Sequence, residues 1–211
     1  ISNNISENIK LFASYNKSMR TPNYTELYYL SPTNAGNVNL KSEHSTNKEI
    51  GIKWQDIIHK TSVTYYQRKG VNMIDWVLID GDSVWRTQNL SQVTTSGYEI
   101  NSKINLNKLI NVKFPISYLL LNYAQNASDT TSKGFQSAYV LDHLKTNFSL
   151  TATQIINPKI RIDWRASYQD REGGYIDFTS GEESEYLPFW LVSTRASLQV
   201  FEKNTISIFG V

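Results

Sequence analysis

The feature that most constrains this chain is a long alternation of apolar and polar residues. In residues 96–106, Tyr98, Ile100 and Ile104 fall on one face, whereas Glu99 and Lys103 fall on the other. The same alternation recurs in residues 143–153 and 161–169, and more weakly in residues 9–17, 48–54, 61–68, 112–123, 190–200 and 205–209. A period of two is typical of β-strands. The sequence therefore predicts an all-β chain of about nine strands.

The length of these strands and the charges within them favour a barrel. Strands of soluble sheets usually have about 5–6 residues, whereas strands that cross a membrane need about 9–11. The predicted strands have roughly 7–12 residues, and their polar faces carry full charges in mid-strand. In a β-sandwich such a face can only meet solvent, but in a barrel it can line a wet or protein-filled lumen.

The connections alternate between short and long. The short connections are residues 55–60, 107–111, 155–159 and 201–204, and the long ones are residues 20–45, 75–96, 125–142 and 170–189. Outer-membrane barrels have short turns at one end and long loops at the other. The pattern predicts an antiparallel meander of simple hairpins, with the long loops together at one end.

The alternation also predicts which side chains face lipid, because a charge on the lipid face is unfavourable. The expected lipid-facing residues are Tyr98, Ile100, Ile104, Leu144, Phe148, Leu150, Ile162, Trp164 and Tyr168. The residues expected on the concave side are Glu99, Lys103, Lys145, Asn147, Arg161, Asp163 and Arg165.

Composition excludes several classes of protein. Lys and Arg (21) nearly balance Asp and Glu (19), which argues against a nucleic-acid binder. The absence of cysteine excludes disulfides and thiolate metal sites. The polar first ten residues do not form a signal peptide, and no apolar run is long enough for a membrane helix. The 13 Tyr, 8 Phe and 5 Trp fit both a membrane barrel and a secreted, sugar-binding β-sandwich.

A series of motifs resembles the TonB-dependent receptors, most of all their cobalamin-receptor branch. The series is L-F-A-S-Y-N-K-S-M-R-T-P at residues 11–22, E-L-Y at 26–28, G-N-V-N-L-K-S-E at 36–43, E-I-G at 49–51, and Asn89 followed by G-Y-E at 97–99. Val38 and Ser42 replace two prolines of the family pattern. The motifs occur in the family's order and with its spacing along essentially the whole chain.

The resemblance implies a bacterial outer-membrane barrel of about 22 strands with an N-terminal plug and a TonB box. Residues 1–211 then form a partial barrel, without plug, TonB box or last strand. The implied function is active import of a scarce nutrient, a cobalamin or a siderophore or other metal chelate. The implied partners are outer-membrane lipid, the nutrient ligand, TonB through the N-terminal part, and a surface lipoprotein. No enzymatic activity, cofactor or nucleic acid is implied.

Candidate site residues follow from the loops and the polar faces. Large aromatic rings give contact area at small entropic cost, so loop aromatics and neighbouring polar groups are candidates for ligand binding. They are Arg20, Tyr24, Tyr28, Tyr29, Trp76, Trp85, Arg86, Asn89, Arg171 and Tyr175. The candidates for facing the lumen or plug are Glu49, Glu99, Lys103, Arg161, Asp163 and Arg165. Each also has a plainer reading as a strand end, a loop-packing residue or a solvated charge.

Three other functions remain open at this level. A passive porin shares the strands and loops but needs neither a plug nor the motif series. A barrel enzyme needs His clustered with Asp or Ser, yet the three histidines lie far apart and show no catalytic or metal-ligand spacing. A soluble carbohydrate-binding β protein would need no detergent.

Overall fold

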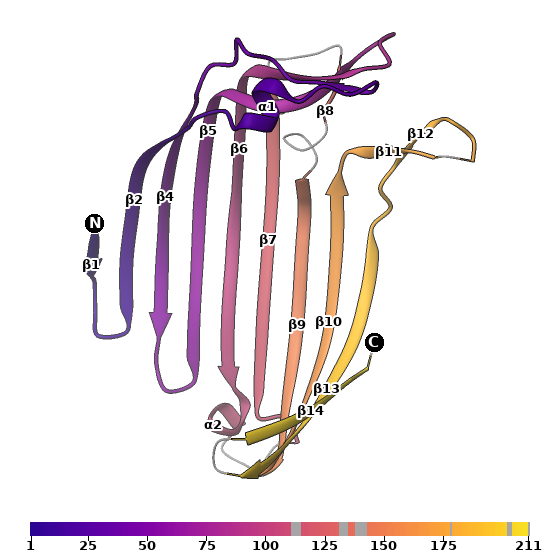
Figure 1. Cartoon of the computed structure of the whole chain (residues 1–211). Coiled ribbons are helices and arrows are strands. Elements are labelled where there is room, and N and C mark those ends of the chain that lie inside the picture. Colours follow the sequence, from indigo (N-terminus) through magenta and orange to yellow (C-terminus); the bar gives the residue numbers. More distant parts are fainter. Residues whose placement is uncertain (111–114, 131–134, 138–142, 178, 202–203, 211) are drawn as a thin grey trace.

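A computed structural model describes residues 1–110, 115–130, 135–137, 143–177, 179–201 and 204–210 of the chain. These residues form a curved wall of long strands (Figure 1). The long strands are β2 (Ile9–Arg20), β4 (Glu43–Gln55), β5 (His59–Ile79), β6 (Trp85–Asn105), β7 (Tyr118–Thr130), β9 (His143–Asn157), β10 (Ile160–Glu172) and β13 (Phe189–Phe201). The shorter strands are β1 (Ser2–Asn4), β3 (Asn34–Ala35), β8 (Phe135–Ser137), β11 (Gly174–Ile176), β12 (Glu183–Glu185) and β14 (Asn204–Gly210).

The predicted antiparallel meander is confirmed. Within the described residues, twelve strands form one sheet, and its main path runs β1-β2-β4-β5-β6-β7-β9-β10-β13-β14. Each strand on this path pairs antiparallel with its neighbours, and β11 and β12 form a separate hairpin. Nine strands of the path correspond to the predicted ones, and β1 is an additional, polar edge strand.

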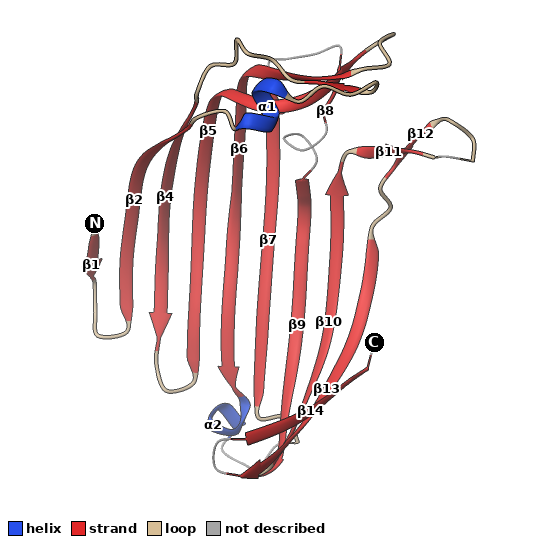
Figure 2. Cartoon of the chain, viewed as in Figure 1, coloured by secondary structure: helices blue, strands red, loops and turns tan. Residues whose placement is uncertain are grey.

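Two short helices interrupt the strands (Figure 2). They are α1 (Tyr24–Tyr28) and α2 (Leu106–Ile110), of five residues each. In the described part of the chain neither helix is long and apolar enough to cross a membrane.

The pairing register aligns the apolar residues into rows across the sheet. Residues directly opposite each other on neighbouring strands share a face. One row of such partners runs Leu11, Ile52, Val63, Ile100, Tyr123, Phe148, Tyr168 and Trp190. Eight consecutive strands thus place an apolar side chain at the same height on one face.

The opposite face is polar along the same strands. One row there runs Ser14, Glu49, Tyr66, Gly97 and Asn126. Another runs Gln55, Lys60, Lys103, Leu120, Thr151, Arg165 and Ser193. The register and the alternation along each strand put the two predicted sets of residues on opposite faces of the sheet, except for Leu144, which pairs with Arg171 beyond a bulge.

The long connections cluster at one end of the sheet, here called the loop end, and the short ones at the other, the turn end (Figure 1). The clustering was predicted, but the loop predicted at residues 75–96 is wrong. Strands β5 and β6 have 21 residues each and pair as far as Val77 and Arg86, so only residues 80–84 connect them. Trp76, Arg86 and Asn89 therefore lie on strands.

Three other predicted elements have boundaries that differ from those in the structure. Residues 112–123 do not form one strand, because β7 begins at Tyr118 and runs to Thr130, while residues 111–114 lie outside the described residues. The connection at 125–142 contains β8, and its residues 131–134 and 138–142 also lie outside them. The turn predicted at 107–111 is largely α2.

The outer parts of β5 and β6 belong to a second structural unit. Strand β3 pairs parallel with β6, and β8 pairs antiparallel with β5. The order β3-β6-β5-β8 is called the loop-end sheet below. Its small apolar core consists of Val77, Leu90 and Val93, packed against Met73 and Phe135. This core joins β5 and β6 to β8, which lies in the connection between β7 and β9.

Two motif glycines give room to aromatic side chains of the neighbouring strand. A Cβ at Gly97 would lie 2.4 Å from the Gln125 carbonyl oxygen and 2.8 Å from the Tyr66 hydroxyl. Tyr66 crosses Gly97 and donates a hydrogen bond to Asn126 Oδ1. Phe12 covers Gly51 in the same way, 2.4 Å from a Cβ there. The glycines of E-I-G and G-Y-E thus serve to pack rings across the polar face.

We expect Gly97→Ala to destabilise the barrel that contains this segment by about 1–3 kcal/mol, because the backbone oxygen of Gln125 cannot move away from the added methyl. Gly210→Ala is the matched control, since its Cβ would lie 3.5 Å from the Thr194 methyl, an ordinary contact. Urea unfolding of the detergent-solubilised protein measures both. Equal midpoints for the two variants would contradict this packing.

Candidate functional site

A network of charges joins three motif residues at the loop end. The Arg20 guanidinium donates from Nε and Nη2 to the Glu43 carboxylate, at 2.8 and 2.7 Å. Its Nη1 donates to both carboxylate oxygens of Glu26, at 2.9 and 3.0 Å. The Ile74 amide donates to Glu43 Oε1 at 2.7 Å. This Arg20 network (Arg20, Glu26 and Glu43) ties β2, α1 and β4 to β5.

The network shifts the pKa values of Arg20 and Glu43, which lie beyond the apolar rows. The hydrogen bond to Glu43 raises the pKa of Arg20 above its ordinary value, although burial opposes it. Burial acts to raise the pKa of Glu43, but the hydrogen bonds of Arg20 and the Ile74 amide and the charges of Arg20 and Arg68 hold it below its usual range. Both groups are therefore charged at neutral pH.

Helix α1 begins at a residue suited to cap it. Pro22 cannot donate a backbone hydrogen bond, and Asn23 accepts from the Glu26 amide at 2.8 Å while Glu26 accepts from the Asn23 amide at 2.8 Å. Glu26 thus caps the helix and binds Arg20 at once.

The motif at residues 36–43 docks beneath this helix. The Gly36 amide donates to the Tyr29 carbonyl at 2.6 Å, and the Asn37 amide donates to the Glu26 carbonyl at 2.9 Å. The buried Thr87 hydroxyl donates to the same carbonyl at 2.7 Å. A Cβ at Gly36 would lie 2.8 Å from the Leu27 carbonyl carbon, so the close approach requires glycine.

Asn89 fastens the end of the same motif. Its Oδ1 accepts from the Lys41 amide at 2.8 Å, and its Nδ2 donates to the carbonyls of Lys41 and Asn72 at 2.9 and 2.8 Å. Asn72 adopts a positive φ of 55° there. These hydrogen bonds all go to backbone groups, so the observed role of Asn89 is to organise the loop.

The predicted aromatic residues near α1 lie together. Tyr24 and Tyr28 have ring centroids 5.0 Å apart, and Tyr29 meets Trp76 edge to face at 6.2 Å. Tyr24 is 78 %, Tyr28 57 % and Tyr29 48 % exposed. These four residues are called the aromatic cluster. Its three tyrosines present accessible ring surface at the loop end, and Trp76 is half-buried beside Tyr29.

Trp85 and Arg86 lie next to this cluster on β6. Trp85 is half-buried, with its amide bound to the Thr33 carbonyl at 2.9 Å, and Arg86 is exposed, with Nε 3.3 Å from Asp82. A polar hollow of about 400 Å³ lies beside them, lined by Gly36, Asn37, Arg86, Thr87, Gln88 and Asn89.

Arg171, near the end of β10, and Tyr175 on β11 form a separate group. The Arg171 guanidinium lies 5.3 Å from the Tyr186 ring, and the Tyr175 and Tyr186 rings are 5.6 Å apart. Tyr186 was not among the predicted residues. The loop end therefore carries two aromatic groups, one around α1 and one beyond β10.

The charged candidates of the polar face have mostly local contacts. Glu49 accepts from the Ser14 hydroxyl at 3.2 Å, and Asp163 accepts from Arg161 Nη2 at 2.8 Å. Glu99 and Arg165 make no ion pair within the described residues. Lys103 lies 4.6 Å from the Tyr118 ring centroid.

Glu26, Glu43 and Thr87 were not predicted as functional residues. The signal for Glu26 and Glu43 was the motif series, whose members meet in the Arg20 network. Thr87 lies outside that series. No group of His, Cys, Asp and Glu suited to a metal ion occurs among the described residues. His59 stacks on Trp54 at 4.6 Å, next to Asp56.

A family model described as TonB dependent receptor-like, beta-barrel matches residues 3–210. The chain belongs to the TonB-dependent receptor family. It is part of an outer-membrane β-barrel, and the matched relatives are transporters and receptors rather than enzymes, as predicted.

Two relatives are vitamin B12 transporters named BtuB. The chain is 28 % identical over 97 residues to the one from Vibrio vulnificus, which covers 46 % of this chain and 15 % of that protein. It is 28 % identical over 102 residues to the one from Photobacterium profundum, covering 47 % and 16 %. The predicted likeness to the cobalamin-receptor branch is confirmed, although the match spans a small share of each transporter.

Solved receptors share the fold at low sequence identity. The copper transporter OprC superposes with a TM-score of 0.71 and 13 % identity, over 98 % of this chain and 31 % of that one. The siderophore receptor PirA from Pseudomonas aeruginosa superposes with a TM-score of 0.69 and 15 % identity, over 98 % of this chain and 33 % of that one. A ferric enterobactin receptor (PfeA) from the same organism, in complex with enterobactin, has a TM-score of 0.69 and 14 % identity, over 98 % of this chain and 33 % of that one.

We expect Arg20→Met to loosen the contact between β4 and β5 at the loop end, because it leaves the Glu43 charge without its main donor. The free energy of local opening should fall by about 1–3 kcal/mol, the range for a hydrogen bond to a charged group. Hydrogen exchange at the Ile74 amide measures it. Lys48→Met on β4 is the control, and unchanged Ile74 exchange in Arg20→Met would rule out the network's role.

The lowered pKa of Glu43 predicts that the loop end becomes less stable in acid. Because the folded pKa lies below the ordinary value of 4.5, the stabilisation is complete above that value and is lost as the pH falls through the folded pKa. The loop can be followed with a spin label on a cysteine that replaces the exposed Thr33. The mobility of this label should stay constant from neutral pH down to pH 4.5 and should increase below pH 4.5. The same label in Glu43→Gln should lack this transition, and an identical transition there would assign it to another group.

Proposed function

We propose that the protein to which this segment belongs is an active importer of a scarce nutrient. It binds a cobalamin, or a siderophore or other metal chelate, at the loop end, and TonB supplies the energy through an N-terminal part with a plug. Residues 1–211 supply part of the barrel wall. Cobalamin is the first candidate, supported by the likeness to vitamin B12 transporters.

The observation that carries this proposal is the aromatic cluster on a rigid support. Tyr24, Tyr28, Tyr29 and Trp76 expose ring surface at the loop end, where the Arg20 network and the loop-end sheet hold α1 in place. Binding residues commonly lie on loops positioned by a rigid scaffold. Trp85 and Arg86 extend the same surface, and Arg171 and Tyr175 add the second aromatic group of the loop end, whereas Arg20 and Asn89 position the aromatic cluster.

The two faces of the sheet support an orientation of the barrel wall with one face toward lipid and the other toward the lumen. We assign the apolar rows to lipid and the polar face to the lumen, where Glu49, Glu99, Lys103, Arg161, Asp163 and Arg165 meet water or the plug. Trp164 and Trp190 on the apolar face are at least half exposed, as residues of an interfacial girdle would be. A surface lipoprotein that covers the loop end is a further partner of this proposal.

Trp76→Ala and Arg86→Ala are each expected to weaken ligand binding by the intact receptor about tenfold, as the loss of one well-packed contact does. Binding of cyanocobalamin and of ferric enterobactin is measured on receptor in detergent micelles. Leu109→Ala on α2 at the turn end is the control and should bind normally. Equal affinities for all three variants would exclude the aromatic cluster as the binding surface.

A second measurement separates import from passive diffusion. Cells that depend on the receptor for cobalamin should lose growth on low cobalamin when TonB is deleted. Unchanged growth without TonB would contradict active import and would favour a porin.

A further inference from the structure

Two pairs of lysines face each other directly across the strands near the turn end. Lys10 on β2 is the register partner of Lys53 on β4, and Lys60 on β5 is the partner of Lys103 on β6. The two pairs occupy adjacent rows of the polar face, since Lys53 pairs with Ser62 and Lys60 with Gln55. Like charges directly opposite each other destabilise a sheet, so this arrangement needs a compensating interaction.

The described part of the chain does not supply that compensation. None of the four lysines forms an ion pair there, although Lys145, Arg20, Arg86 and Arg161 do. Glu7 and Asp56 line a neighbouring hollow with Lys10 and Lys53, but not within ion-pair distance. Asp56 instead accepts from the Ile58 and His59 amides at 2.7 and 2.6 Å, which stabilises its own turn.

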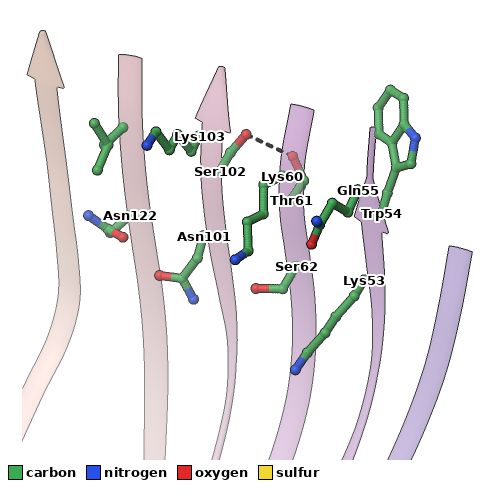
Figure 3. Close-up of a pocket in the computed structure, with 11 residues that line it drawn as sticks. Lys53, Trp54, Gln55, Lys60, Thr61, Ser62, Asn101, Ser102, Lys103 and Asn122 are labelled. Carbon is green, nitrogen blue, oxygen red and sulfur yellow. Dashed lines mark hydrogen bonds between the residues drawn. The ribbon is translucent and has the colours of Figure 1, made fainter. Parts of the chain in front are cut away.

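The side chains of two of the four lysines, Lys53 and Lys103, lie near aromatic rings. Lys53 Nζ lies 4.9 Å from the Phe12 ring centroid, and Lys103 Nζ lies 4.6 Å from that of Tyr118. Figure 3 shows Lys53 and Lys60 extending into the space that Ser62 and Asn101 also face. The ring contacts offset part of the repulsion but supply no negative charge.

The space among these side chains is a hollow of about 330 Å³. Its lining includes Lys53, Lys60 and Lys103, the hydroxyl group of Ser62, and amides of Gln55, Asn101 and Asn122, but no carboxylate. Ammonium groups carry three hydrogen-bond donors each, and hydroxyl and amide groups add further donors. The set suits a compact oxyanion and excludes a metal cation as the natural occupant.

We propose that this hollow, called the lysine site, binds a soluble oxyanion that carries a phosphate or carboxylate group. Its size fits such a group rather than a folded acidic surface. The bound charge compensates both lysine pairs and accounts for why they face each other. The proposal depends on the register and the hollow, and not on the nutrient proposed above.

The test is lysine acetylation of the intact receptor in detergent micelles, mapped by mass spectrometry. Sodium phosphate and sodium succinate are compared with sodium chloride at equal ionic strength. At an anion concentration of about twice the dissociation constant, two thirds of the sites are filled, and acetylation of Lys53, Lys60 and Lys103 should slow about threefold. Lys48, exposed on the opposite face of β4, should react at the same rate in all three salts.

Variants of one lysine pair make the test specific. The double variant Lys60→Gln with Lys103→Gln should lose the anion effect at Lys53 and unfold at a higher temperature in chloride, because it removes one like-charge pair. The double variant Lys60→Arg with Lys103→Arg keeps the charge and should retain the effect.

Two results would overturn the proposal. The first is equal protection of the lysines in phosphate, succinate and chloride. The second is that the lysines are already protected in sodium chloride, without phosphate or succinate, and that carbodiimide cross-links Lys60 to acidic residues. This result would assign the charge compensation to an acidic protein segment. Loss of nutrient import with an intact anion effect would count against the proposed function alone.

Discussion

The structure depends on the pairing register of the strands. Each backbone amide and carbonyl of a strand that crosses a membrane must find a partner in a neighbouring strand, since lipid offers none. The side-chain period of two then divides every strand between two faces, and a slip by one residue would exchange them. Because the rows through Ile100 and Lys103 stay in register across consecutive strands, the row through Ile100 is apolar and the row through Lys103 is polar apart from Leu120.

The loop end is held in a different way from the wall. Beyond the apolar rows the described residues form a small core around Val77 and Leu90, and polar interactions supply further order. The Arg20 network links four separate segments through side chains that are charged at neutral pH. Gly36, Thr87 and Asn89 complete it with hydrogen bonds to backbone. The motif residues that mark the family are thus those that fix the platform on which exposed aromatic rings are presented.

Much of the wall could be predicted, because alternation is a local signal. Nine strands, their meander and their two faces follow from residue order alone. The outer halves of β5 and β6 could not be predicted, since Ile74, Asp75 and Val77 are all buried and the alternation ceases there. Asn72 also adopts a positive φ of 55°, which is uncommon for a residue other than glycine. Strand β1 was missed because Ser2, Asn3 and Asn4 are uniformly polar.

The site was less predictable than the wall. The aromatic cluster could be anticipated from residue type, but the partners of Arg20 lie 6 and 23 positions away and meet only in the folded chain. Arg20 and Asn89 accordingly form hydrogen bonds to segments far away in the sequence. The opposed lysines could not be recognised before the register was known, because neither pair is close in sequence.

The central claim, that one face meets lipid and the other the lumen, is open to a direct measurement. The segment has no cysteine, so single cysteines can be placed at residues 99–104 of β6 in the intact receptor, in brominated phospholipid vesicles. A bimane label should be quenched at Ile100, Ser102 and Ile104 and remain bright at Glu99, Asn101 and Lys103. Uniform quenching along β6, or quenching at the charged positions instead, would contradict this account.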